Sequence, residues 1–123
     1  MSHFEWDETA AIEFFGTLPM ESHDNGRNLS FKVTQSIATL ALGVNLDTSD
    51  CSVTLHVAGL ERPVFQAVYL GSPGARIVND KRGHYLELGS PGSFSGQYDG
   101  IQPLASGVRI QLQPQLAIAA FVA

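Results

Sequence analysis

Short runs of alternating apolar and polar residues, separated by turn-forming residues, constrain the fold of this chain most. Leu29, Phe31 and Val33 alternate with polar neighbours, and the same period of two recurs at residues 40–46 and 51–57. Side chains two positions apart share one face of a β-strand, so each run predicts a strand with one buried and one solvated face. Half-buried strands of this kind are typical of antiparallel sheets.

Later segments extend the pattern toward the C-terminus. Residues 64–70 are apolar on both faces apart from one glutamine, which favours a central strand. Residues 75–79 and 84–88 flank a short loop, Asp80 to Gly83, and this arrangement predicts a tight hairpin with glycine at a position of positive φ.

The last two predicted strands, residues 108–113 and 116–122, are separated by Pro114. The second is apolar on both faces, and exposing one such face costs several kcal/mol at about 25 cal/mol per Å². We therefore expect this strand to be covered, either inside its own sheet or by another copy of the chain.

The N-terminal segment carries two competing patterns. Residues 2–5 have the form of a helix capping box, but from residue 4 to residue 14 the even positions are mostly apolar and the odd ones mostly polar. We interpret residues 4–14 as an edge strand.

Turn-forming residues divide the chain at near-regular intervals, and no stretch of about ten residues keeps a helical apolar stripe. The sequence therefore predicts a single all-β domain of eight or nine short strands over residues 1–123. Its expected architecture is an antiparallel β-sandwich of jelly-roll or Greek-key type, or a small closed β-barrel, and the pattern does not choose between them. A repeated Leu-Gly-Ser-Pro-Gly motif at residues 70–74 and 88–92 predicts two similar turns at one end of the molecule.

Composition limits the classes of partner. The chain is 44% apolar and only 15% charged, and its first 26 residues hold six acidic side chains without a lysine or arginine. A basic stripe that could follow phosphates is absent, so nucleic acid is not an expected partner. We expect a cytoplasmic protein without a membrane partner, because neither a signal peptide nor a transmembrane run is present. High apolar content in so small a chain favours a homo-oligomer.

Residues able to carry chemistry are scattered along the chain. The four histidines share no metal-ligand spacing, and the single Cys51 is expected to be a buried structural thiol. We assign no catalytic residue, metal ligand or cofactor. A small enzyme with a His/Asp site requires His56, His84, Asp80 and Asp99 to meet in one pocket.

Residues 89–107 form a glycine-, serine- and proline-rich segment with aromatic and amide side chains. Small-molecule and sugar sites use this composition, because rings give a stacking face and amides fix orientation. The candidate ligand-binding residues are Phe94, Gln97, Tyr98, Asp99 and Gln102. The alternative is a long connection packed by its own aromatic rings.

The sequence thus favours a non-catalytic β-sandwich module that self-associates and presents loops to a protein or glycan partner. Two alternatives stay open: a carbohydrate or small-ligand module that uses the 89–107 loop, and a small β-fold enzyme.

Overall fold

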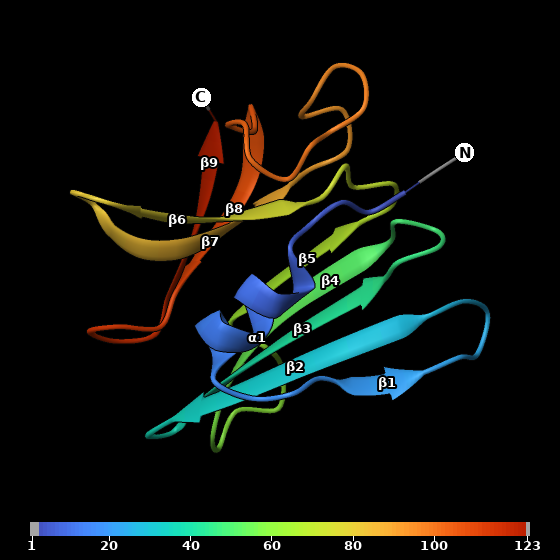
Figure 1. Cartoon of the computed structure of the whole chain (residues 1–123). Coiled ribbons are helices and arrows are strands. Elements are labelled where there is room, and N and C mark those ends of the chain that lie inside the picture. Colours follow the sequence, from blue (N-terminus) through green and yellow to red (C-terminus); the bar gives the residue numbers. More distant parts are fainter. Residues whose placement is uncertain (1–2, 123) are drawn as a thin grey trace.

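The computed structural model describes residues 3–122, which form two antiparallel sheets packed face to face and one short helix beside them (Figure 1). The helix is α1 (Glu8–Phe15). The strands of the first sheet are β1 (Met20–Ser22), β2 (Asn28–Gln35), β3 (Ala38–Asn45), β4 (Cys51–Val57) and β5 (Phe65–Tyr69). The strands of the second are β6 (Ala75–Asp80), β7 (Gly83–Gly89), β8 (Ser106–Gln111) and β9 (Ala117–Val122).

Both sheets are meanders in which neighbouring strands also follow one another in the chain. Every strand pair is antiparallel, and the connection between β5 and β6 leads from the first sheet to the second. The expected antiparallel β-sandwich is confirmed, and two separate sheets distinguish it from the closed barrel. The connections are simpler than the expected jelly-roll or Greek-key order, because no strand in either sheet skips a neighbour.

The core lies between the sheets, where the register aligns the apolar positions of successive strands. Phe31 pairs with Leu42, and Leu42 pairs with Val53, so three fully buried side chains form one row across β2, β3 and β4. Leu86 and Ile110 form a matching buried row on the other sheet. Each side chain of this kind contributes about 1.5–3 kcal/mol when it is removed from water.

The N-terminal segment is helical, so the prediction of an edge strand over residues 4–14 is wrong. The Asp7 side chain caps the helix by accepting a hydrogen bond from the Ala10 amide at 3.1 Å, and Gly16 ends it in the left-handed conformation. The apolar positions of the segment also fit a helical stripe, which faces the core. Its buried members are Ala11, Phe14 and Phe15.

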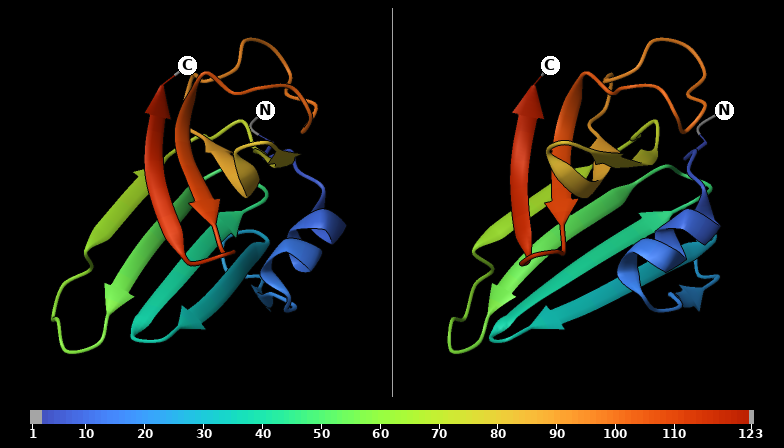
Figure 2. Two further views of the ribbon diagram at one scale, coloured as in Figure 1. Left: turned by 90° about the vertical axis from the view of Figure 1, so that its left-hand side faces the viewer. Right: turned by 60° about the vertical axis from the view of Figure 1, so that its left-hand side comes forward.

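Helix α1 packs against β2 and β6 and closes one side of the sandwich, whereas β5 and β9 lie on the side away from it (Figure 2). Strand β5 is the last strand of its sheet, so the prediction of a central strand at residues 64–70 is wrong. An apolar pattern on both faces suits a central strand, but it equally suits an edge strand whose outer face stays exposed.

The two Ser-Pro-Gly turns lie together at one end of the molecule, as expected. The Ser72 hydroxyl donates a hydrogen bond to the Gly89 carbonyl at 2.6 Å, and the Gly89 amide donates to the Gly74 carbonyl at 2.9 Å.

Cys51 is buried in the core, and burial raises the pKa of its thiol to about 12. Among the described residues, no helix has the length and apolar character needed to cross a membrane.

We predict that Gly83→Val lowers the free energy of unfolding by about 1 kcal/mol or more, because Gly83 has a φ of 126°, a conformation that a β-branched residue adopts only with strain. Chemical denaturation measures the loss. Lys81→Thr, an exposed change in the same turn, is the control. Equal midpoints for wild type and Gly83→Val would show that the turn does not require glycine.

Candidate functional site

The side of the sandwich formed by β5 and β9 is incompletely covered. Side chains that point from these two strands toward the core are only half-buried, although those of the central strands are fully buried. These half-buried residues are Phe65, Ala67, Tyr69, Leu116 and Ile118. The two edge strands therefore expose part of the core at this side.

Exposed apolar side chains lie on the same two strands or beside them. Val68 is 57% exposed on the outer face of β5, and Val122 is 87% exposed at the end of β9. Val64 and Leu70 flank β5 and are also exposed. We call the half-buried and exposed apolar residues of β5 and β9, with Val64 and Leu70, the open side. Exposed apolar side chains that gather on one side of a small domain can mark an interaction site.

A buried carboxylate organises the outer face of the second sheet. Glu87 lies in the middle of β7, between Arg76 of β6 and Arg109 of β8 in the strand register. The Arg76 Nε donates to one carboxylate oxygen at 2.9 Å and the Arg109 Nε donates to the other at 3.0 Å. The Leu104 amide adds a third hydrogen bond at 3.2 Å. We call these four residues the Glu87 network.

The Glu87 carboxyl stays ionised in this environment. Burial alone would raise its pKa, but the hydrogen bonds from Arg76, the Leu104 amide and Arg109 outweigh burial and hold the pKa below its usual value. Two guanidinium groups face a single carboxylate, so the network carries one excess positive charge.

The network also holds the long segment between β7 and β8 against the sheet. Besides the Leu104 contact, Arg76 donates to the Ile101 carbonyl at 3.4 Å. Within the segment, Tyr98 is buried, its hydroxyl donates to the Gln102 carbonyl at 2.8 Å, and its ring centre lies 4.9 Å from that of Phe94.

The five candidate ligand-binding residues of this segment thus have different surroundings. The rings of Phe94 and Tyr98 pack with Leu104 and Phe121 in a small apolar cluster. Asp99 accepts hydrogen bonds from the Ile101 and Gln102 amides and from the Gln102 side chain, so it stabilises a turn. Gln97 is exposed. A hollow of about 310 Å³ is lined by His3, Pro73, Gly96, Gln97 and Tyr98.

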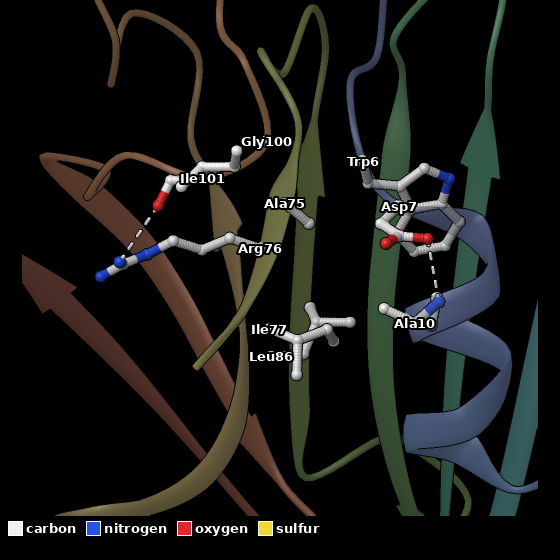
Figure 3. Close-up of a pocket in the computed structure, with 10 residues that line it drawn as sticks. Trp6, Asp7, Ala10, Ala75, Arg76, Ile77, Leu86, Gly100 and Ile101 are labelled. Atoms are coloured by element: carbon white, nitrogen blue, oxygen red, sulfur yellow. Dashed lines mark hydrogen bonds between the residues drawn. The ribbon is translucent and has the colours of Figure 1, made fainter. Parts of the chain in front are cut away.

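A smaller cavity of about 150 Å³ lies between α1 and β6 (Figure 3). Trp6 and Ala10 form its wall on the helix side, and Ala75, Ile77 and Leu86 form its wall on the sheet side, while the Arg76 side chain turns away toward Ile101. Its charged lining residues already have partners, because Asp7 caps the helix and Arg76 is bound to Glu87. The cavity is therefore a packing space at the junction of helix and sheet.

The four candidate catalytic residues are not brought together. His56 is exposed on the outer face of the first sheet, Asp80 and His84 lie on the β6–β7 hairpin, and Asp99 belongs to the turn described above. Within residues 3–122, no group of three histidine, cysteine, aspartate or glutamate side chains is placed to hold a metal ion.

Negative charge is concentrated on the first half of the molecule. Residues 1–74 carry nine acidic and three basic side chains, whereas residues 75–123 carry three acidic and four basic ones. Arg27 lies among several of the acids: it pairs with Glu8 and Glu21, and its amide donates to Asp47 at 2.9 Å. Most of these acids lie in the N-terminal segment, in α1 and in the loops of the first sheet, because Glu21 is the one acidic residue within its described strands.

Sequence reasoning missed the Glu87 network. A signal was present, because Arg76, Glu87 and Arg109 are charged residues inside predicted strands, where side chains are usually apolar or small and polar. Pairing the strands in hairpin register would have placed the three side chains in one row.

Comparison with known proteins identifies a shared fold. No protein-family model and no curated protein matches the sequence. Among solved structures, the chain is similar to a chain of a contact-dependent growth inhibition toxin–immunity protein complex from Klebsiella pneumoniae 342. The TM-score is 0.76 at 14% sequence identity, and the match covers 100% of both chains.

We predict that Glu87→Gln lowers the free energy of unfolding at neutral pH by about 2–3 kcal/mol, because it leaves two partly buried arginines without their counter-ion. The pKa of Glu87 is lower in the folded than in the unfolded state, so its stabilisation is complete well above the usual glutamate pKa of about 4.3 and is lost as the pH falls through the folded value.

Denaturation at pH 7 and at pH 3 tests both statements, with exposed Glu61→Gln as the control. The difference between wild type and Glu87→Gln should shrink at pH 3. An equal difference at both pH values would mean that the ionised carboxylate is not the stabilising group.

Proposed function

We propose that this protein is a non-catalytic binding module that inactivates a toxic protein partner by covering part of its surface. The observation that carries the proposal is the likeness of fold, over the full length of both chains, to a chain of a toxin–immunity protein complex. An immunity role requires a complementary surface and no chemistry of its own. The separation of the candidate catalytic residues supports this role over an enzymatic one.

The open side is the surface that we assign to the partner. It combines exposed apolar side chains with the unpaired edges of two strands, and both can be covered by another protein. Val68, Val122 and their neighbours form the apolar centre that a protein interface needs. On the opposite side, α1 covers the core with Ala11, Phe14 and Phe15.

The test pairs this chain with the polypeptides encoded beside it in its genome, because a toxin and its antidote must be inherited together. We expect one of them to arrest bacterial growth, and co-expression of this chain to restore growth. We also expect the two purified proteins to form a stable complex in size-exclusion chromatography with light scattering. If no neighbouring product is both toxic and bound by this chain, the proposal fails.

Variants locate the surface. Val68→Asp and Val122→Asp should each weaken the complex by about tenfold or more, because a charge is placed in an apolar interface. Both side chains are exposed in the isolated chain, so folding should be unaffected. Leu18→Asp is the matched control, since Leu18 is 75% exposed and follows α1 on the other side. Equal affinities for all three variants would rule out the open side.

Self-association is a second candidate, favoured by the exposed apolar side chains of β9. A second copy could cover this strand in the absence of the toxic partner. Sedimentation at micromolar concentration should then show a dimer that Val122→Asp converts to a monomer. If the wild-type protein sediments only as a monomer of 13.2 kDa, self-association is ruled out.

The segment between β7 and β8 is an alternative ligand site. Its hollow beside Gln97 and Tyr98 has the size of a small polar ligand, such as one sugar ring. Packing of both aromatic rings within the protein leaves Gln97 as the candidate residue most available to a glycan or other small ligand.

A further inference from the structure

A second surface feature lies next to the open side, on the outer face of the second sheet. A groove of about 190 Å³ runs across β7, β8 and β9. It is lined by Arg82, Tyr85, Arg109, Gln111, Ala117 and Ala119. Cationic, aromatic and amide groups thus line one side of the groove, and two alanines of the edge strand line the other.

Arg109 is held rigidly at this groove. Its Nε is bound to Glu87, its guanidinium carbon lies 4.2 Å from the ring centre of Phe121, and the ring centre of Tyr85 is 5.5 Å away. The side chain nevertheless remains 31% exposed. A guanidinium that is already ordered loses little entropy when it binds an anion, and the Nη groups remain available as donors.

The charged groups around the groove sum to a positive value. Arg76 and Arg109 share Glu87, and Arg82 pairs with Asp80, which also accepts a hydrogen bond from the Tyr85 hydroxyl. Three guanidinium groups therefore face two carboxylates, in a chain whose net charge is −5. The groove is a local positive site on an acidic protein, and it suits a negatively charged ligand.

The edge strand leaves Arg109 accessible from outside the sheet. Ala119 is directly opposite Arg109 in the register, and Ala117 is opposite Gln111. Small side chains at these two positions let a side chain from beyond β9 reach over the edge toward the guanidinium. In the described residues, β9 pairs only with β8, so its outer edge can accept a further strand.

We propose that the groove binds the carboxylate of an acidic, extended segment of the protein partner, and that this segment pairs with the outer edge of β9. The inference rests on the proposed function and names the chemistry of the partner. An Asp or Glu of the partner segment, placed opposite Ala119, would add a second carboxylate to the cross-strand row formed by Arg76, Glu87 and Arg109. Its carboxylate would accept hydrogen bonds from the Arg109 Nη groups beside the Tyr85 ring.

The test uses two pentapeptide probes, Ac-TVEVT-NH2 and its neutral counterpart Ac-TVQVT-NH2, with the full-length ¹⁵N-labelled protein. Titration followed by NMR should shift the Arg109 Nε–H signal and the backbone amides of β9. The acidic peptide should bind about tenfold more tightly than the neutral one, since ionic hydrogen bonds exceed neutral ones. Equal affinities, or shifts confined to other strands, would overturn the inference.

A variant that fills the groove provides a second test in which Arg109 itself is not changed. Ala119→Glu supplies an internal carboxylate beside the guanidinium and should abolish binding of the acidic peptide. Ser30→Glu, which adds the same charge at an exposed position of β2 in the other sheet, should leave peptide binding unchanged. Because both sites are exposed, thermal denaturation should show that both variants remain folded. If the two variants bind the peptide equally, the groove is not the site.

The outcomes also separate this inference from the proposed function. A partner complex that is lost with Val68→Asp but unaffected by Ala119→Glu would leave the proposed function standing and remove the groove from it. Binding of the acidic peptide as described, without any toxic partner, would support the groove and remove the toxin-neutralising role.

Discussion

A single buried carboxylate determines how the second sheet is built. Glu87 has no contact with water, and an ion in that position is stable only when charged donors surround it. Arg76 and Arg109 provide these donors from the two neighbouring strands, and the Leu104 amide provides another from the segment that follows. A shift of either strand by one residue would turn its arginine to the other face of the sheet and break the network. Strand register and loop position therefore depend on the same side chain.

The core is covered to different extents on the two sides of the sandwich. Along β2 and β6 the helix α1 covers the core with three apolar side chains, whereas along β5 and β9 the core residues remain half-buried. The open side and the positive groove adjoin each other along β9, so apolar area and charge recognition can act on the same partner. In the complex that we propose, apolar burial would supply most of the affinity and the positive groove would contribute specificity.

The sequence was most informative where one residue and its near neighbours decide the structure. Alternation placed Phe31, Leu42 and Val53 correctly in the core, and Gly83 marked the hairpin. The helix was missed because Phe4 and Trp6, which precede it, add apolar residues at even positions and create an apparent period of two. The helix instead begins at its Asp7 cap and ends at Gly16, and its buried stripe consists of Ala11, Phe14 and Phe15.

Sequence reasoning was weakest where partners are far apart in the chain. Arg76 and Arg109 lie 11 and 22 residues from Glu87, so no local pattern joins them. The apolar character of β5 and β9 was evident, but an apolar strand fits a sheet centre and an exposed interface equally well. Which of the two applies depends on strand order, and that order is a property of the whole fold.

Hydrogen–deuterium exchange on the complex with the proposed toxic partner tests the central claim most directly, because it shows which strands that partner covers. We predict that binding slows amide exchange in β5 and β9 and leaves the exchange rates of α1 and β1 unchanged. Protection confined to α1 and β1, with β5 and β9 exchanging as in the isolated chain, would contradict it.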